Sequence, residues 1–154
     1  MKIKHILIGA GALGIIGSGL ILSTPQCHYL GNNPNNVFPD PKCTTGVIDP
    51  TLTTEKICDP NFRTGTIRNV SQAEKNQVAK EYGLSSLKGM EIDHLISLEL
   101  GGSNDVKNLW PELGFPNPKD KIENRCHEMV CVGKISLAEA QKEISTNWTT
   151  ACQQ

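Results

Sequence analysis

Two histidines that stand beside carboxylate or amide side chains are the residues in this sequence best suited to carry chemistry. His94 directly follows Asp93 in the chain. His127 lies four residues after Glu123 and three residues after Asn124. A carboxylate can hold a divalent cation, and a neutral imidazole can take a proton from water. The pair at 93–94 therefore indicates a site that combines metal binding with general-base catalysis.

A buried strand and a helix are expected to position these side chains. Residues 90–100 are apolar and β-prone in their middle, which is typical of a strand. Neighbouring residues inside a regular strand point to opposite faces of the sheet. The aspartate and the histidine could still share one pocket if they lie at a strand end or at a bulge. Residues three and four apart on a helix share a face, so a helix over 118–131 brings Glu123, Asn124 and His127 together.

Between the strand and this helix, the sequence predicts a loop and a second strand. Gly-Gly-Ser-Asn at 101–104 is the loop, and Asn-Leu-Trp at 108–110 is a short strand that we expect to end at Pro111. Pro118 suits the first turn of the helix, and Gly133 ends it. The predicted order is strand, loop, strand, helix, and the predicted fold class is α+β.

Capping boxes predict two further helices. Ser71 with Glu74 begins one helix, which ends at Gly83. A second Ser–Glu pair at the same spacing begins the other helix near residue 136. This second helix carries one apolar stripe, formed by Leu137, Ala140, Ile144 and Trp148.

Composition divides the chain into three parts. Residues 1–26 place two lysines before an apolar run, which is typical of a secretory signal peptide, with an N-terminal membrane anchor as the alternative. Residues 27–61 are a Pro- and Asn-rich, Cys-containing tether and loop. Residues 62–150 form the predicted domain, with its motifs at 90–131. Either reading of the first part predicts a domain outside the cytoplasm, which is secreted, periplasmic or membrane-anchored.

Six cysteines in a chain of 154 residues fit that localisation. The region from Cys43 to Cys58 has little predicted regular structure, so at least one disulfide is expected to order it. Spacing alone does not decide the pairing. A zinc site is the competing interpretation, but the sequence contains no Cys-x2-Cys pair, and we expect no structural zinc.

The charge balance excludes a polybasic nucleic-acid binder. Fifteen basic and sixteen acidic side chains leave a formal net charge of −1, so there is no general positive field. Lys119, Lys121 and Arg125 nevertheless make one helix locally cationic.

The ordered motifs resemble the HNH family of ββα-metal nucleases, also called His-Me finger nucleases, in its small exported form. The matching stretch, 92–111, holds the Asp-His strand, the Gly-Gly-Ser-Asn loop and the Asn-Leu that opens the second strand. His127 is similar to the third motif residue of the family, on the helix. The resemblance covers roughly 90–131.

The resemblance implies a ββα-metal core with flanking helices and a disulfide-stapled N-terminal loop region. It also implies an exported endonuclease that hydrolyses phosphodiester bonds. His94 would be the general base and Asn108 would orient it, while Asp93 and His127 would hold one divalent cation, Mg2+ or Mn2+. Asn124 is the alternative helix ligand, because the span from Asn108 to His127 is longer than is usual in the family and holds three prolines.

A nucleic acid is the partner that this activity implies, with DNA favoured over RNA. Lys119, Lys121 and Arg125 are expected to contact it, and the membrane would be met only through an N-terminal anchor. Two other classes remain open. One is a catalytically inactive metal- or surface-binding module on the same scaffold. The other is a disulfide-stapled interaction protein in which the Asp and His residues are incidental.

Overall fold

The structure of this protein, a computed structural model, describes residues 26–31, 37–114 and 117–153. The expected signal peptide or anchor, 1–26, lies outside the described residues except for its last position. Within those three ranges, no helix is both long and apolar enough to cross a membrane.

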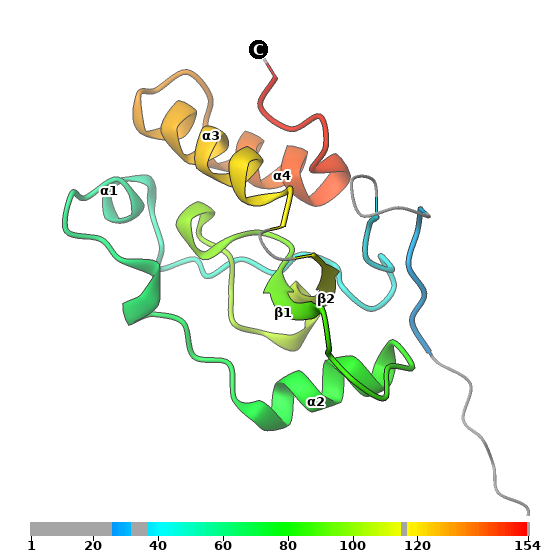
Figure 1. Cartoon of the computed structure of the whole chain (residues 1–154). Coiled ribbons are helices and arrows are strands. Elements are labelled where there is room, and N and C mark those ends of the chain that lie inside the picture. The colour runs from blue at the N-terminus through cyan, green and yellow to red at the C-terminus, as the bar shows by residue number, and fades with distance from the viewer. Residues whose placement is uncertain (1–25, 32–36, 115–116, 154) are drawn as a thin grey trace, which may run out of the picture.

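The chain is a mixed α/β protein built around one small antiparallel sheet. In Figure 1 the two strands lie between helix α2 on one side and helices α3 and α4 on the other. The elements, in chain order, are α1 (Thr54–Ile57), η1 (Thr64–Thr66), α2 (Gln72–Glu81), β1 (Met90–His94), η2 (Leu98–Leu100), η3 (Val106–Asn108), β2 (Leu109–Leu113), α3 (Asp120–Cys131) and α4 (Leu137–Asn147), where η marks a 3-10 turn.

Most helix boundaries follow the local signals in the sequence, but the prediction of Pro118 in the first turn of a helix was wrong, because α3 begins at Asp120 with Lys119 as its N-cap. Both hydrogen bonds of the Ser71–Glu74 capping box form at the start of α2. The Ser136 hydroxyl accepts a hydrogen bond from a backbone N–H in the first turn of α4. Gly83 and Gly133 take positive φ angles of 70° and 74° just after α2 and α3, a conformation that glycine adopts without strain.

The first strand is shorter than expected. β1 ends at His94, whereas the apolar pattern predicts a strand that continues to residue 100. The Asn108 side chain explains the difference, because its Oδ1 accepts from the Ile96 N–H at 3.0 Å and its Nδ2 donates to the Ile96 carbonyl at 2.9 Å. The backbone of Ile96 is thereby bonded to a side chain instead of a strand partner, and the chain turns into η2.

The second strand continues through Pro111, where we expected it to end. Pro111 lies opposite Ile92 in the register of the two strands. Its carbonyl accepts a hydrogen bond from the Tyr29 hydroxyl at 2.8 Å, so the backbone of Pro111 faces away from β1. The missing N–H of proline therefore costs the ladder no hydrogen bond, as at an edge strand.

Two apolar clusters flank the sheet region. One gathers α3 and α4 with Ile57 of α1, Leu100 of η2 and the loop residues Leu52 and Ile96. The other packs α2 against the sheet, with Val78, Tyr82, Ile92, Leu109 and Trp110 as its centre. Residues before position 62 are part of both cores, since Cys27 is buried in the second cluster and Leu52 in the first.

All six cysteines are paired. The disulfides are Cys27–Cys43, Cys58–Cys131 and Cys126–Cys152. They confirm the prediction of a disulfide in the region from 43 to 58, and they agree with an oxidising environment. Cys58–Cys131 fastens the end of α1 to α3 and closes the longest loop of the three, with a sequence separation of 73.

Candidate active site

His94 is the last residue of β1, and its position at the strand end brings it beside Asp93. The His94 ring is buried and its Nδ1 lies 3.9 Å from the Asp93 carboxylate Oδ1. Within a regular strand the two side chains would point to opposite faces. Because the strand stops at His94, both side chains reach the same site.

The amide of Asn104 determines where the His94 ring carries its proton. The Asn104 Nδ2 donates to the carbonyl of Ile67 at 2.9 Å, and its Oδ1 accepts from the backbone N–H of Asn69 at 3.2 Å. This orientation leaves the Oδ1 facing His94 Nε2 at 3.1 Å. The Nε2 must therefore donate, and the Nδ1 carries the lone pair, which faces Arg68 Nη1 at 3.5 Å.

Burial keeps the His94 ring neutral. Desolvation is the main cause that lowers the pKa of His94 to about 4. The negative charge of Asp93 acts in the opposite direction, and the positive charges of Arg68 and Lys119 add to the lowering. At neutral pH the imidazole can thus accept a proton.

The loop that carries Asn104 is held by Asn108 and by a close glycine contact. Asn108 is fully buried, and its Nδ2 also donates to the carbonyl of Ser103 at 2.8 Å. A Cβ at Gly102 would lie 1.8 Å from the Ile96 carbonyl oxygen, so only glycine fits there. The side-chain bonds of Asn108 in the structure are to this loop, and its effect on His94 passes through the position of Asn104.

A fully buried lysine ammonium occupies the space between β1, β2 and α3. Lys119 Nζ donates to Asp93 Oδ2 at 3.2 Å and to the carbonyl of His94 at 2.8 Å. It also pairs with the carboxylate of Glu123, one turn along α3, and lies 3.7 Å from Glu112 Oε2. Three carboxyl groups therefore share one cation.

This crowding separates the protonation states of the carboxyl groups. Burial raises the pKa of Glu112 to about 9 and that of Glu123 to about 7. Burial is also the largest single influence on Asp93 and acts to raise its pKa, but the Lys119 ammonium and the hydrogen bonds with the His94 backbone and with Glu112 together lower that pKa overall. Asp93 is the carboxylate that keeps its negative charge most firmly, while Glu112 is neutral at pH 7.

Arg68 completes the side chains around His94. Its Nη1 lies 3.5 Å from His94 Nδ1 and 4.0 Å from Asp93 Oδ1, and half of the side chain is exposed. Arg68 also borders a cavity of about 210 Å³ that is open to solvent. The cavity is lined by Thr64, Arg68, Ser97, Leu98, Glu99, Asp120, Glu123 and Asn124.

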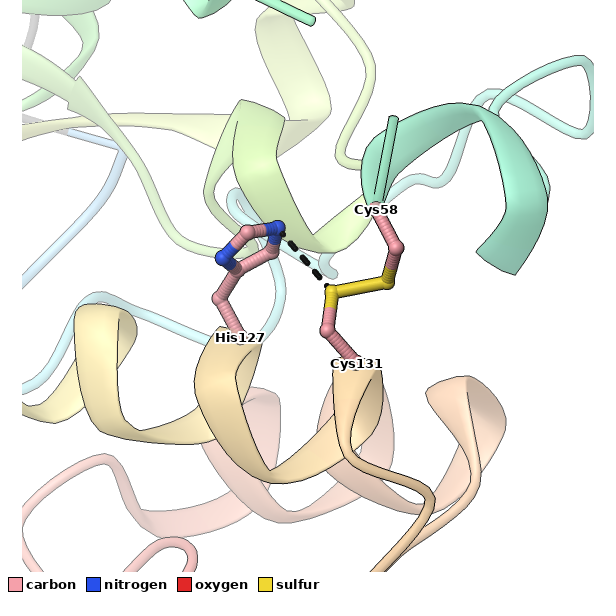
Figure 2. A group of neighbouring side chains, drawn as sticks. All are labelled: Cys58, His127 and Cys131. Atoms are coloured by element: carbon pink, nitrogen blue, oxygen red, sulfur yellow. Dashed lines mark hydrogen bonds between the residues drawn. A yellow bond between two sulfur atoms is a disulfide. The ribbon is translucent and has the colours of Figure 1, made fainter. Parts of the chain in front are cut away.

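His127 has other neighbours than those expected for a partner of Asp93. Its Nε2 lies 3.0 Å from the carbonyl of Ile57. The same Nε2 lies 3.5 Å from Cys131 Sγ, the contact drawn as a dashed line in Figure 2. In the described part of the chain, no hydrogen bond or ion pair joins His127 to Asp93. The part of α3 that lies near Asp93 is instead its N-terminal end, where Lys119, just before the helix, bonds to Asp93 and to Glu123, one to two turns before His127.

The three basic residues at and just before α3, Lys119, Lys121 and Arg125, do not form one cationic surface. Lys121 is exposed, as expected for a residue that contacts nucleic acid. Lys119 differs from that expectation because it is fully buried and bonded to carboxylates. Arg125 is partly buried, and its Nη2 donates to the carbonyl of Ala151 at 2.7 Å.

Three residues of this site, Arg68, Asn104 and Glu112, are not among those predicted from the sequence. Asn104 stood in the Gly-Gly-Ser-Asn motif, so that motif was its only signal. Arg68 lies 25 positions before Asp93, outside every motif, and only the fold brings it there. Asn124, the alternative helix ligand, lines the cavity beside Arg68. In comparisons with known proteins, no family model, no curated protein and no solved structure matches this chain.

Proposed function

We propose that this protein is an exported, metal-dependent endonuclease that hydrolyses the phosphodiester bonds of nucleic acid. The observation that carries the proposal is the state of His94: a neutral, buried ring with its proton on Nε2 and a lone pair on Nδ1. That lone pair lies beside a firmly ionised carboxylate, Asp93, and a half-exposed cation, Arg68. These are the groups that phosphodiester hydrolysis requires.

In this proposal His94 acts through Nδ1, which takes a proton from the attacking water. The imidazolium that forms keeps its Nε2–H bond to the Asn104 oxygen, and the charge of Asp93 stabilises it. Asn108 is a positioning residue, because it holds the loop from which Asn104 reaches the ring.

The donor set at the site fits the divalent cation that the resemblance implies. Asp93 Oδ1 is not bonded to Lys119 and offers a hard oxygen ligand, as Mg2+ and Mn2+ prefer. On α3, Glu123 and Asn124 line the adjoining cavity and are the residues that would complete the site. A bound cation would supply charge to stabilise the scissile phosphate and the leaving oxygen.

Arg68 is suited to bind the substrate phosphate. Its guanidinium is fixed near His94 and Asp93 yet remains half exposed, so a phosphate oxygen can reach it. This local cation, with Lys121 on the exposed side of α3, lets a chain of net negative charge bind a polyanion.

The proposal is tested by incubating the purified full chain with supercoiled plasmid and with RNA in Mg2+, in Mn2+ and in chelator. We expect cleavage that stops when the metal is removed, with DNA as the better substrate. His94→Ala should lower the turnover about 10²–10⁴-fold while the circular dichroism spectrum is retained. His28→Ala serves as the matched control, because in the part of the chain that the structure describes His28 is hydrogen-bonded through its backbone N–H and not through its ring. Unchanged cleavage by folded His94→Ala protein would refute the role of His94.

One observation favours the alternative of an inactive binding module on this scaffold. The Lys119 ammonium already neutralises part of the charge on Asp93 and Glu123, which competes with a bound cation. Such a module would bind Mn2+ without cleaving either nucleic acid. Calorimetry with Mn2+, together with the cleavage assay, therefore separates the two functions.

A further inference from the structure

A second group of potential metal ligands lies at the C-terminal end of α3. In the three described ranges, Cys58, His127 and Cys131 are the one set of at least three His, Cys, Asp or Glu residues whose ligand atoms all lie within 4.8 Å of one another. Figure 2 shows His127 and Cys131 on α3, with Cys58 bonded to Cys131. We propose that reduction of the Cys58–Cys131 disulfide creates a Cys2His site for a zinc-like divalent cation.

The positions of the ligands on α3 support this proposal. His127 and Cys131 are four residues apart, so they share one face of the helix. Their Nε2 and Sγ atoms are 3.5 Å apart. Zinc bonds of about 2.3 Å to sulfur and about 2.0 Å to nitrogen, at tetrahedral angles, give a sulfur–nitrogen edge of about 3.5 Å. Two of the three ligands therefore already stand at the separation that the metal requires.

A dithiol reductant supplies the electrons and protons that convert the Cys58–Cys131 disulfide into two thiols. The reductant gives two electrons and two protons to the disulfide, which becomes two thiols, and it leaves as its own disulfide. The cation then replaces both thiol protons, which pass to solvent. His127 gives up its contact with the Ile57 carbonyl and presents Nε2, with its proton now on Nδ1.

Accessibility favours this disulfide over the other two. Cys131 is exposed, whereas Cys27, Cys126 and Cys152 are buried, so each of the other disulfides has a buried partner. A solvent reductant should therefore open Cys58–Cys131 first. The exposure of Cys131 also leaves room for water as the fourth ligand. The metal would keep the end of α1 attached to α3 while the disulfide is open, as in the newly made, reduced chain.

Co2+ is the probe for the experiment, because thiolate-bound cobalt absorbs characteristically and Zn2+ displaces it. The full chain is reduced with limited dithiothreitol, desalted without oxygen and titrated with Co2+. Peptide mapping after alkylation should find two thiols, at Cys58 and Cys131. We expect one cobalt with thiolate charge-transfer bands per reduced chain, no such bands in the oxidised chain, and loss of the bands on addition of Zn2+.

Variants separate this site from adventitious thiol binding and from the candidate active site. His127→Ala keeps all six cysteines and should weaken Co2+ binding by at least about tenfold, while His28→Ala should leave it unchanged. Cys58→Ser with Cys131→Ser should abolish the bands. The proposal is overturned if a different disulfide opens first, if the two free thiols bind no cobalt, or if folded His127→Ala protein binds cobalt as tightly as the parent chain.

Discussion

Asn104 holds His94 in a single tautomer. The Asn104 amide donates to the Ile67 carbonyl at 2.9 Å, which turns its oxygen toward His94 Nε2 at 3.1 Å. A histidine that serves as a general base needs a defined lone pair, and here an amide 10 residues away in the sequence defines it. The site thus depends on the loop between the two strands as much as on the strands themselves.

Replacing Asn104 by Leu should remove the hydrogen bond that fixes the tautomer of His94. We expect both tautomers of His94 to be populated in 15N NMR spectra, and the turnover to fall about 10–100-fold, the range found when a partner that orients a functional histidine is lost. Asn61→Leu is the matched control, since among the described residues the hydrogen bond of Asn61 is made by its backbone N–H and none is made by its side-chain amide. A single retained Nε2–H tautomer in Asn104→Leu would contradict the assignment.

Stability should decrease as the pH falls below the ordinary pKa of histidine. The pKa of folded His94 is about 4 and its ordinary value is 6.5, so between these values the unfolded chain binds more protons than the folded chain. The stabilisation is complete above pH 6.5 and is lost toward pH 4, by up to about 3 kcal/mol. NMR titration of the ring measures the pKa, and urea unfolding measures the loss. His94→Gln should lack this part of the pH dependence; an NMR pKa near 6.5 would contradict the prediction.

Lys119→Met should destabilise the protein strongly. The substitution keeps an unbranched side chain that is one heavy atom shorter, and it leaves the carboxyl groups of Asp93 and Glu123 buried without their cation. Breaking a buried ion pair by removing one partner typically costs about 3–5 kcal/mol. Urea unfolding is the measurement, and Lys121→Met, on the exposed side of the same helix, should change the free energy by less than about 0.5 kcal/mol. Equal effects of the two substitutions would show that Lys119 is not a buried counter-ion.

The ligands of the divalent cation should be Asp93 on β1 and residues in the first half of α3. We expect Asp93→Asn and Glu123→Gln each to weaken Mn2+ binding to the oxidised chain in calorimetry, because both remove a charged oxygen from the site. His127→Ala should leave this affinity unchanged, since its neighbours are Ile57 and Cys131. If His127→Ala weakened Mn2+ binding and Glu123→Gln did not, His127 would be the helix ligand of the cation.

The local elements could be predicted because their signals are local. The Ser71–Glu74 capping box, the glycines after α2 and α3, and the apolar stripe of α4 act within one or two turns of chain. The prediction of β1 was wrong beyond His94 for the opposite reason. Residues 95–100 are apolar enough for a strand, but the Asn108 side chain, 12 residues away from Ile96, takes its backbone hydrogen bonds.

The sequence by itself identified His94 and Asp93 as candidate reactive residues, and it predicted that at least one disulfide bond would cross-link the chain. Only the tertiary structure decided which side chains meet them. Arg68 and Lys119 approach Asp93 from 25 and 26 positions away, and no pattern of spacing encodes such contacts. The same holds for the three disulfides, because pairing depends on which cysteines the packed core brings within bonding distance.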